Sequence, residues 1–219
     1  MKFSAFDIIS KLVPGSLLLA ICLAILLSLY MDSQFGKHYI EVLKSFDGLL
    51  TVLVTLLAYL VGYVLEAIGS LLIEPIVWRI WGGWPIELLY KNKPTKRTTF
   101  PQYKKVFNVL TKEYFGEDKE ILSRDELDEL YYFSSETTRR HGSEEQNSRQ
   151  QSYIESYVFS RNVIAGLFIS IIVSIIGVFT VGYYWIYSLI LLIVIFVIVY
   201  IRLKDRSLYQ VRNLLNSAY

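Results

Sequence analysis

Residues 163–201 form an apolar block that leaves the chain few ways to fold. The block has 39 residues and no charged side chain. As a single α-helix it would be about 58 Å long, at about 1.5 Å per residue, whereas the hydrocarbon core of a bilayer is about 30 Å thick. We therefore predict that the block turns back on itself and crosses a membrane twice.

The turn within this block is predicted at Thr180–Tyr184, where the sequence is TVGYY. Gly182 can adopt backbone conformations that end a helix, and the two tyrosines suit a membrane–water interface. The resulting third and fourth spans cover about 163–180 and 185–202. The fourth span is bulky and β-branched, so we expect it to face lipid.

Two earlier apolar runs bring the predicted number of spans to four. Residues 12–31 carry no charge and exceed the apolar core of a signal peptide, which is roughly 7–15 residues long, so we interpret them as a retained span. Residues 48–77 are interrupted only by Glu66 and Glu74, and the run is long enough to tilt or to continue as a helix beyond the bilayer. The predicted fold class is all-α, with an integral membrane four-helix bundle.

The basic residues predict the orientation of these spans. Of the 22 Lys and Arg residues, only Lys37 and Lys44 fall in the loop after the first span, and the turn after the third span has none. The other 20 lie at the N-terminus, between spans two and three, or in the C-terminal tail. Because basic residues tend to remain cytoplasmic, we expect both termini and the long hydrophilic segment in the cytoplasm.

The hydrophilic segment, residues 85–160, is predicted to form a small cytoplasmic helical lobe. Apolar side chains at helical spacing predict a helix over 103–115 that ends at Gly116. The chain then divides into residues 1–84 with spans one and two, the lobe, and residues 161–219 with spans three and four and a basic tail.

Two capping boxes, in which a serine and a residue three positions later exchange hydrogen bonds, predict further helix starts in the lobe. Ser123 with Glu126 opens a helix through Tyr132, and His141-Gly142 indicates a stop. The second box, Ser143 with Gln146, opens a helix that has no breaker before Gly166 and should run directly into span three.

The N-terminal residues are predicted to form a separate surface helix. Apolar and polar side chains alternate over 3–11, as in an amphipathic segment lying on the inner membrane surface. Pro14 is expected in the first turn of span one, where its missing N–H has no helical partner.

Small side chains recur every fourth residue in spans one and three. Such stripes let membrane helices approach closely, either within one chain or between the subunits of a homo-oligomer, and both alternatives remain open. The candidate packing residues are Ser16, Ala20, Ala24, Ser28, Gly62, Gly166, Ser170 and Ser174.

Glu66 is the most informative polar residue, because a charge within a span is costly and usually faces protein or water. It lies about 27 Å along the helix from Gly48, so it either hydrogen-bonds near the inner headgroups or acts as a gating carboxylate. Arg161 is its expected partner.

The connector after span two contains Lys91, Lys93, Lys96 and Arg97. These residues either contact anionic lipid headgroups, or they form a solvated connector that is basic only because cytoplasmic segments tend to be basic. Nucleic acid is not expected as a partner, because the neighbouring acidic stretch 117–129 would repel phosphates.

Motifs that carry chemistry are absent from the sequence. There is no phosphate-binding glycine loop, zinc-binding histidine pair or nucleophile elbow. The two histidines are predicted on opposite sides of the membrane, and Cys22 is the single cysteine. We therefore predict no catalytic residue, no metal, no cofactor and no enzymatic activity.

Short motifs that flank the spans resemble those of other membrane proteins. They are Phe6-Asp7-Ile8-Ile9 leading to Pro14-Gly15, then Ser160-Arg161-Asn162, and the basic-aromatic tail 202–209. The spans and flanks resemble a family of small, uncharacterised bacterial four-span inner-membrane proteins. The layout is similar to membrane effectors encoded beside bacterial antiviral systems.

Two functions follow as hypotheses. In the first, implied in part by that resemblance, the chain is a membrane effector in antiviral defence: the lobe receives a signal from a protein or small molecule, and the spans oligomerise and permeabilise the membrane. In the second, the chain is a non-conducting scaffold that tethers or regulates a cytoplasmic partner.

Overall fold

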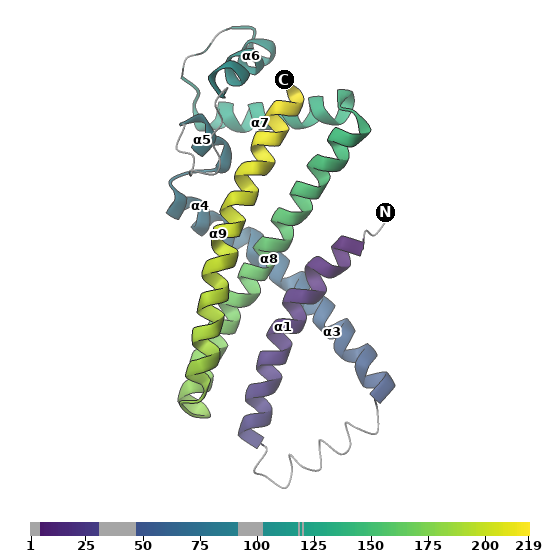
Figure 1. The fold of residues 1–219 in the computed structure, drawn as a ribbon, viewed down its shortest axis with the longest axis vertical. Helices are drawn as coiled ribbons and strands as arrows, with labels where there is room; N and C mark the ends of the chain where they lie inside the picture. Colours follow the sequence, from purple (N-terminus) through teal and green to yellow (C-terminus); the bar gives the residue numbers. More distant parts are fainter. Residues whose placement is uncertain (1–4, 31–46, 92–102, 118, 120) are drawn as a thin grey trace. The chain divides into compact units, whose positions relative to one another are not determined.

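The computed structural model describes residues 5–30, 47–91, 103–117, 119 and 121–219 (Figure 1). These residues form helices and no strand, so the all-α fold class is confirmed for the described part of the chain. Four helical stretches there are long and apolar enough to cross a membrane: Ile8–Leu29, Gly48–Tyr90, Glu144–Thr180 and Trp185–Ala218. The chain therefore has the composition of an integral membrane protein with four spans.

The helices form two compact units. The first comprises residues 1–74 and 158–201, and the second comprises residues 75–157 and 202–219. The predicted lobe segment, 85–160, falls mainly in the second unit.

In the first unit, α1 (Ala5–Tyr30) crosses α3 (Asp47–Ile68) (Figure 1). The crossing brings backbone against backbone, since a methyl group added at Gly15 would overlap the carbonyl oxygen of Ala58 and lie 2.8 Å from the amide nitrogen of Gly62. A methyl group added at Gly62 would overlap the carbonyl oxygen of Lys11. Only glycine permits this approach, as in other closely packed membrane helices.

The prediction of a separate surface helix before span one was wrong, because α1 is one helix from Ala5 with Pro14 inside it. Proline has no N–H to donate to the carbonyl four residues earlier, which here belongs to Ser10. The side chain of Asn162 donates to this carbonyl oxygen at 3.3 Å, and both residues are buried. Helix α8 therefore supplies the hydrogen bond that Pro14 cannot donate to the Ser10 carbonyl, so α1 continues without a break.

The predicted turn between spans three and four is confirmed. Helix α8 (Glu144–Thr180) ends at the predicted residue, and α9 (Trp185–Ala218) begins at the predicted one. Gly182 has φ +139°, a conformation that residues with a side chain rarely adopt. As expected, most of the fourth span is exposed, with Leu192 as its main buried residue.

Half of the predicted packing residues are buried within this chain. Ser16, Ala20, Ala24 and Ser28 are exposed, and Gly62, Gly166, Ser170 and Ser174 are buried. The face of α1 that packs contains Pro14, Gly15 and Ile25 instead. The reason is the crossing with α3, which requires a glycine at the contact and thereby rotates the small-residue stripe outward.

The second span continues past α3 as a π-helical segment, η1 (Gly69–Ile73), and then as α4 (Glu74–Trp81). The run is thus longer than one membrane crossing, as its sequence predicted.

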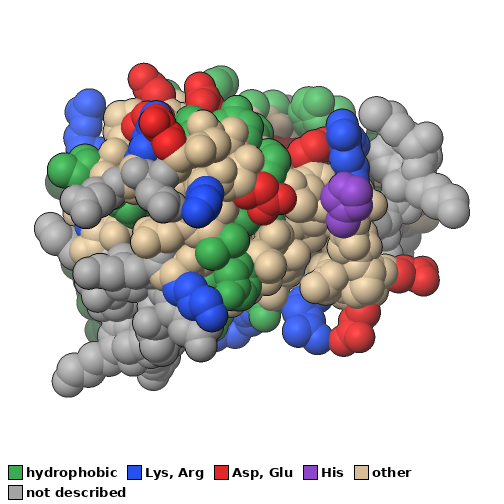
Figure 2. Space-filling view, turned by 90° about the horizontal axis from the view of Figure 1, so that it is seen from above, with side chains coloured by type: hydrophobic (Ala, Val, Ile, Leu, Met, Phe, Trp, Pro, Cys, Tyr) green, Lys and Arg blue, Asp and Glu red, His purple; other side chains and the backbone are tan. Residues whose placement is uncertain are grey.

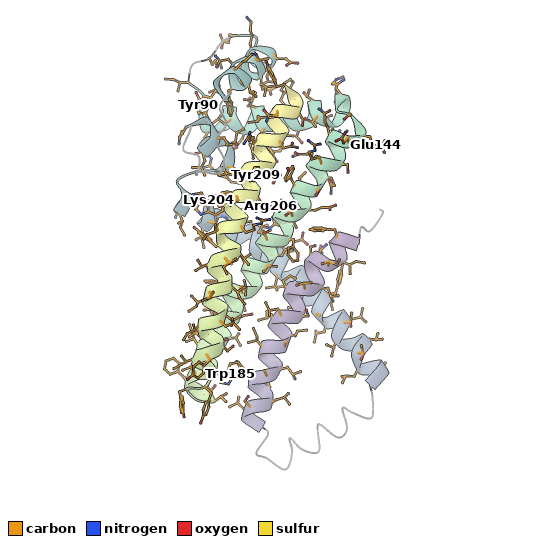
Figure 3. The ribbon with its side chains drawn as sticks, viewed as in Figure 1. Tyr90, Glu144, Trp185, Lys204, Arg206 and Tyr209 are labelled. Carbon is orange, nitrogen blue, oxygen red and sulfur yellow. The ribbon has the colours of Figure 1, made fainter. Side chains whose placement is uncertain are left out.

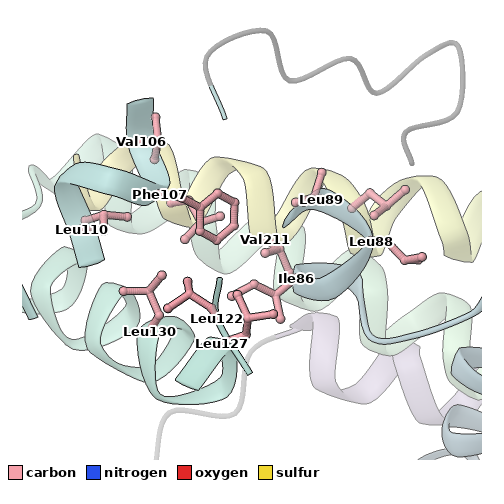
Figure 4. Packing of buried hydrophobic residues seen from close by; sticks show 12 residues of the cluster. Ile86, Leu88, Leu89, Val106, Phe107, Leu110, Leu122, Leu127, Leu130 and Val211 are labelled. Carbon is pink, nitrogen blue, oxygen red and sulfur yellow. The ribbon is translucent and has the colours of Figure 1, made fainter. Parts of the chain in front are cut away.

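The second unit has its own hydrophobic core, formed by α5 (Pro85–Tyr90), α6 (Tyr103–Phe115), α7 (Arg124–His141) and the end of α9. Val106, Phe107 and Leu110 of α6 face Leu127 and Leu130 of α7 (Figure 4). The bounds of α6 match the prediction, whereas α7 extends past Tyr132 to the predicted stop. Figure 2 shows acidic and basic side chains interspersed over the face that it views.

Both predicted capping boxes are present. Glu126 N–H donates to Ser123 Oγ at 3.3 Å and Ser123 N–H donates to Glu126 Oε2 at 2.8 Å. In the second box, Ser143 N–H donates to Gln146 Oε1 at 2.8 Å. Helix α8 starts there and runs without a break to Thr180, as predicted.

The first box predicts a pH dependence. The hydrogen bond from Lys119, together with those from Ser123, lowers the pKa of Glu126 from 4.5 to about 2. Because the pKa of Glu126 is depressed in the folded protein, its charged form contributes its full stabilisation of the second unit above pH 4.5. This contribution is lost as the pH falls towards about 2. A carbon-13 NMR titration should show Glu126 ionised at pH 3.5, and Lys119→Gln should raise its pKa. A wild-type midpoint near the ordinary value would contradict the assignment.

Candidate functional site

Four charged side chains meet within the first unit. Lys11 Nζ lies 3.4 Å from Glu66 Oε2, and Arg161 Nη2 lies 3.9 Å from Glu66 Oε1. Arg161 Nη1 also donates to Glu74 Oε2 at 3.0 Å. We call Lys11, Glu66, Glu74 and Arg161 the charge cluster. Two cations and two carboxylates make it electrically neutral, which is the arrangement that permits charges within a span.

Three members of the cluster come from different helices at one depth. Glu66 lies 18 residues after Gly48, Lys11 lies 18 residues before Leu29, and Arg161 lies 19 residues before Thr180. At about 1.5 Å per residue these separations are about 27–28 Å, close to the thickness of the hydrocarbon core. The cluster therefore lies near the end of the three spans that is opposite the turn between α8 and α9.

The π-helical segment explains how two carboxylates of one span reach the same arginine. Glu66 and Glu74 are eight residues apart, which in a regular α-helix is about 80° beyond two full turns. A π-helical turn accommodates one additional residue, so the pair behaves as residues seven apart, which share a face. Arg161 packs directly on this segment, since a methyl group added at Gly69 would lie 3.3 Å from its Cγ.

Helix α8 also buries three polar side chains at different positions along its length. Asn162, Ser170 and Ser174 are each 0% exposed. Among the described residues, the Asn162 Oδ1 atom and the Oγ atoms of the two serines have no hydrogen-bond partner. We call these three residues the polar seam. An unpaired buried hydroxyl is unfavourable by about 1–3 kcal/mol, so the seam is a strained feature of the packed spans.

The remaining candidate residues are spread over the chain. Ala20 and Ala24 line a groove of about 380 Å³ together with Tyr184, Trp185 and Ser188. Lys91 lies 3.5 Å from Glu87. Lys93, Lys96 and Arg97 lie outside the described residues.

Sequence reasoning identified Glu66 and Arg161 but did not assign Lys11, Glu74 or Asn162 to the site. A signal was present for two of them. Lys11 immediately precedes its apolar run, so it lies about as far from the end of that run as Glu66 does from the start of its own. A proline within an apolar helix also implies a free carbonyl four residues earlier, which called for a donor such as Asn162.

The described residues include no group of three or more His, Cys, Asp or Glu side chains that could hold a metal ion. No protein-family model, curated protein or solved structure matches the chain. The functional argument therefore rests on the charge cluster and the polar seam.

Proposed function

We propose that this chain is a bacterial inner-membrane effector that oligomerises and permeabilises the membrane when its cytoplasmic lobe receives a signal. The polar seam is the observation that carries the proposal. Asn162 donates to the carbonyl oxygen of Ser10, but its Oδ1 atom and the hydroxyl groups of Ser170 and Ser174 are buried with no hydrogen-bond partner among the described residues. Two such serines are unfavourable in a helix that only packs against its neighbours. Exposure of the seam to water would satisfy these groups, so separation of α8 from its neighbours lowers their free energy and gives water and ions a path.

The charge cluster would hold the resting state. It joins α1, α3 with its extension, and α8 through side-chain contacts near one end of the spans. Each charge in the cluster is compensated by an opposite charge. Loss of one contact would therefore leave an uncompensated charge between the helices and destabilise the closed arrangement.

A signal received by the lobe would reach the spans through two unbroken helices. Helices α8 and α9 each contribute residues to both compact units. A displacement of their lobe segments would be transmitted along these two helices.

Oligomerisation is supported by the amount of apolar surface in the first unit. Nine of the ten residues in 48–57 are exposed. In a membrane this surface faces lipid or another copy of the chain, and the outward small-residue stripe of α1 offers a second contact. The defence setting is proposed from the resemblance in layout.

The scaffold hypothesis is favoured by a different observation. Glu66 contacts both Lys11 and Arg161, so its carboxylate is engaged inside the chain rather than lining an open path. A tether would hold this arrangement permanently.

Alanine replacement of the two seam serines distinguishes the functions. Ser170→Ala with Ser174→Ala removes the unpaired hydroxyls, which should stabilise the closed spans. On induced expression in bacteria, we expect depolarisation by the wild type and about fivefold less by the double variant, corresponding to about 1 kcal/mol. A potential-sensitive dye measures this.

The matched control is Ser16→Ala with Ser28→Ala, which removes two exposed hydroxyls that donate to the carbonyls of Val13 and Ala24 in their own helix. It should depolarise like the wild type. Intact membrane potential with the wild type at full expression and with the lobe's signal present would overturn the effector function and leave the scaffold.

A further inference from the structure

A polar cavity of about 290 Å³ opens beside the C-terminal part of α9, within the second unit. Arg202, Asp205, Arg206 and Tyr209 line it. Their spacing of three, four and seven residues places them on one helical face. Tyr153 of α8 supplies the other wall, so every side chain around the cavity carries a polar group.

The walls of this cavity are held by packing on the other sides of α9. Leu208, Val211 and Leu215 belong to the core of the second unit. About one turn beyond Tyr209, Asn213 Nδ2 donates to Gln150 Oε1 of α8 at 3.1 Å. The two helices are therefore tied together beside the cavity, and the site is built before any ligand arrives.

The two arginines lack the partners that other arginines of this unit have. Arg139 and Arg140 pair with Glu136, and Arg149 pairs with Glu145. Within the described part of the chain, Arg202 and Arg206 form no ion pair. Two guanidinium groups one turn apart at a cavity are suited to the oxygen atoms of a phosphate group.

Asp205 restricts the ligand further. Its carboxylate lies on the same face as the arginines and would repel a bare anion, but it accepts hydrogen bonds from hydroxyl groups. The tyrosine hydroxyls can donate to phosphate oxygens or to an alcohol. A phosphate ester whose alcohol portion carries free hydroxyls matches Arg202, Arg206 and Asp205 together.

We propose that this cavity binds a hydroxylated phosphate ester, with the phosphate on Arg202 and Arg206 and a hydroxyl on Asp205. Arg202 directly follows the apolar run that ends at Ile201, so the ligand is either the headgroup of phosphatidylglycerol or a soluble ester such as glycerol 3-phosphate. Binding does not require the membrane to be permeabilised, so this inference stands independently of the function proposed above.

Native mass spectrometry of the full chain in detergent tests the proposal. One arm titrates short-chain phosphatidylglycerol, and the other titrates glycerol 3-phosphate. We expect saturable binding of one molecule in at least one arm, and the stronger arm identifies the source. Arg206→Gln should weaken binding about tenfold or more, as for loss of a charge-assisted hydrogen bond. Arg206→Lys keeps the positive charge but loses the planar guanidinium group. Its affinity for the ligand should therefore lie between those of the wild type and Arg206→Gln.

Lys204→Gln is the matched control. Lys204 lies on the same helix near Arg206 (Figure 3), but its Nζ is 5.5 Å from the centre of the Trp81 ring and does not line the cavity. Its removal should change the affinity by less than about twofold. Unchanged thermal unfolding of each variant shows that folding is intact. Absence of saturable binding in both arms, or equal weakening by Lys204→Gln and Arg206→Gln, would overturn the proposal.

Discussion

Gly62→Ala should separate α1 from α3 and destabilise the first unit by about 3 kcal/mol or more. Overpacking of a core by one or more methyl groups usually costs about 1–3 kcal/mol, because neighbouring side chains can move. Here the added methyl group meets the backbone carbonyl of Lys11, and a helical backbone cannot rotate away as a side chain can. Thermal unfolding in detergent, followed by circular dichroism, measures the loss.

Gly48→Ala is the matched control, since a methyl group added there meets no atom within 4 Å. It should leave stability unchanged or raise it by up to about 1 kcal/mol, as expected for removal of a helical glycine. Equal stability of the Gly62 and Gly48 variants would show that the two helices do not cross in backbone contact.

Arg161→Gln is the second change with a large expected effect. It leaves the Glu74 carboxylate, which is 17% exposed, without its cation. Removal of one partner from a buried ion pair typically costs about 3–5 kcal/mol, because the remaining charge is uncompensated. We expect a loss of this size in the same unfolding measurement. Arg139→Gln, in which an exposed arginine loses its pairing with Glu136, should have little effect.

A double-mutant cycle separates the ion pair from other effects of Arg161. Glu74→Gln in the Arg161→Gln background removes the stranded carboxylate, so the double variant should be more stable than Arg161→Gln alone. Additive losses would mean that the two side chains do not interact. The cluster would then not hold the spans together.

Local features were predictable because they depend on neighbouring residues. The turn around Gly182, the end of α6 and both capping boxes each follow from a few side chains acting on their own backbone. The count of four spans follows similarly, because length and apolar character alone determine whether a helix can cross a bilayer.

Features that join distant residues could not be predicted in this way. The stripe from Ser16 to Ser28 has the spacing of a packing face, yet α1 packs through Gly15 because α3 presents Gly62 at the crossing. The pairing of Arg161 with Glu74 depends on a π-helical turn, whose presence no local pattern indicated.

The amino-acid sequence by itself thus determined the class of the molecule, the turn between α8 and α9, and the starts of α7 and α8. Tertiary structure alone decided which face of α1 is buried, which charges meet, and why Pro14 does not end its helix. The physical reason is that membrane helices gain little from burying apolar side chains against one another, since lipid solvates these equally well. Close backbone contacts and polar groups therefore determine which helices pack together and through which faces. The positions of these contacts become defined only when the helices meet.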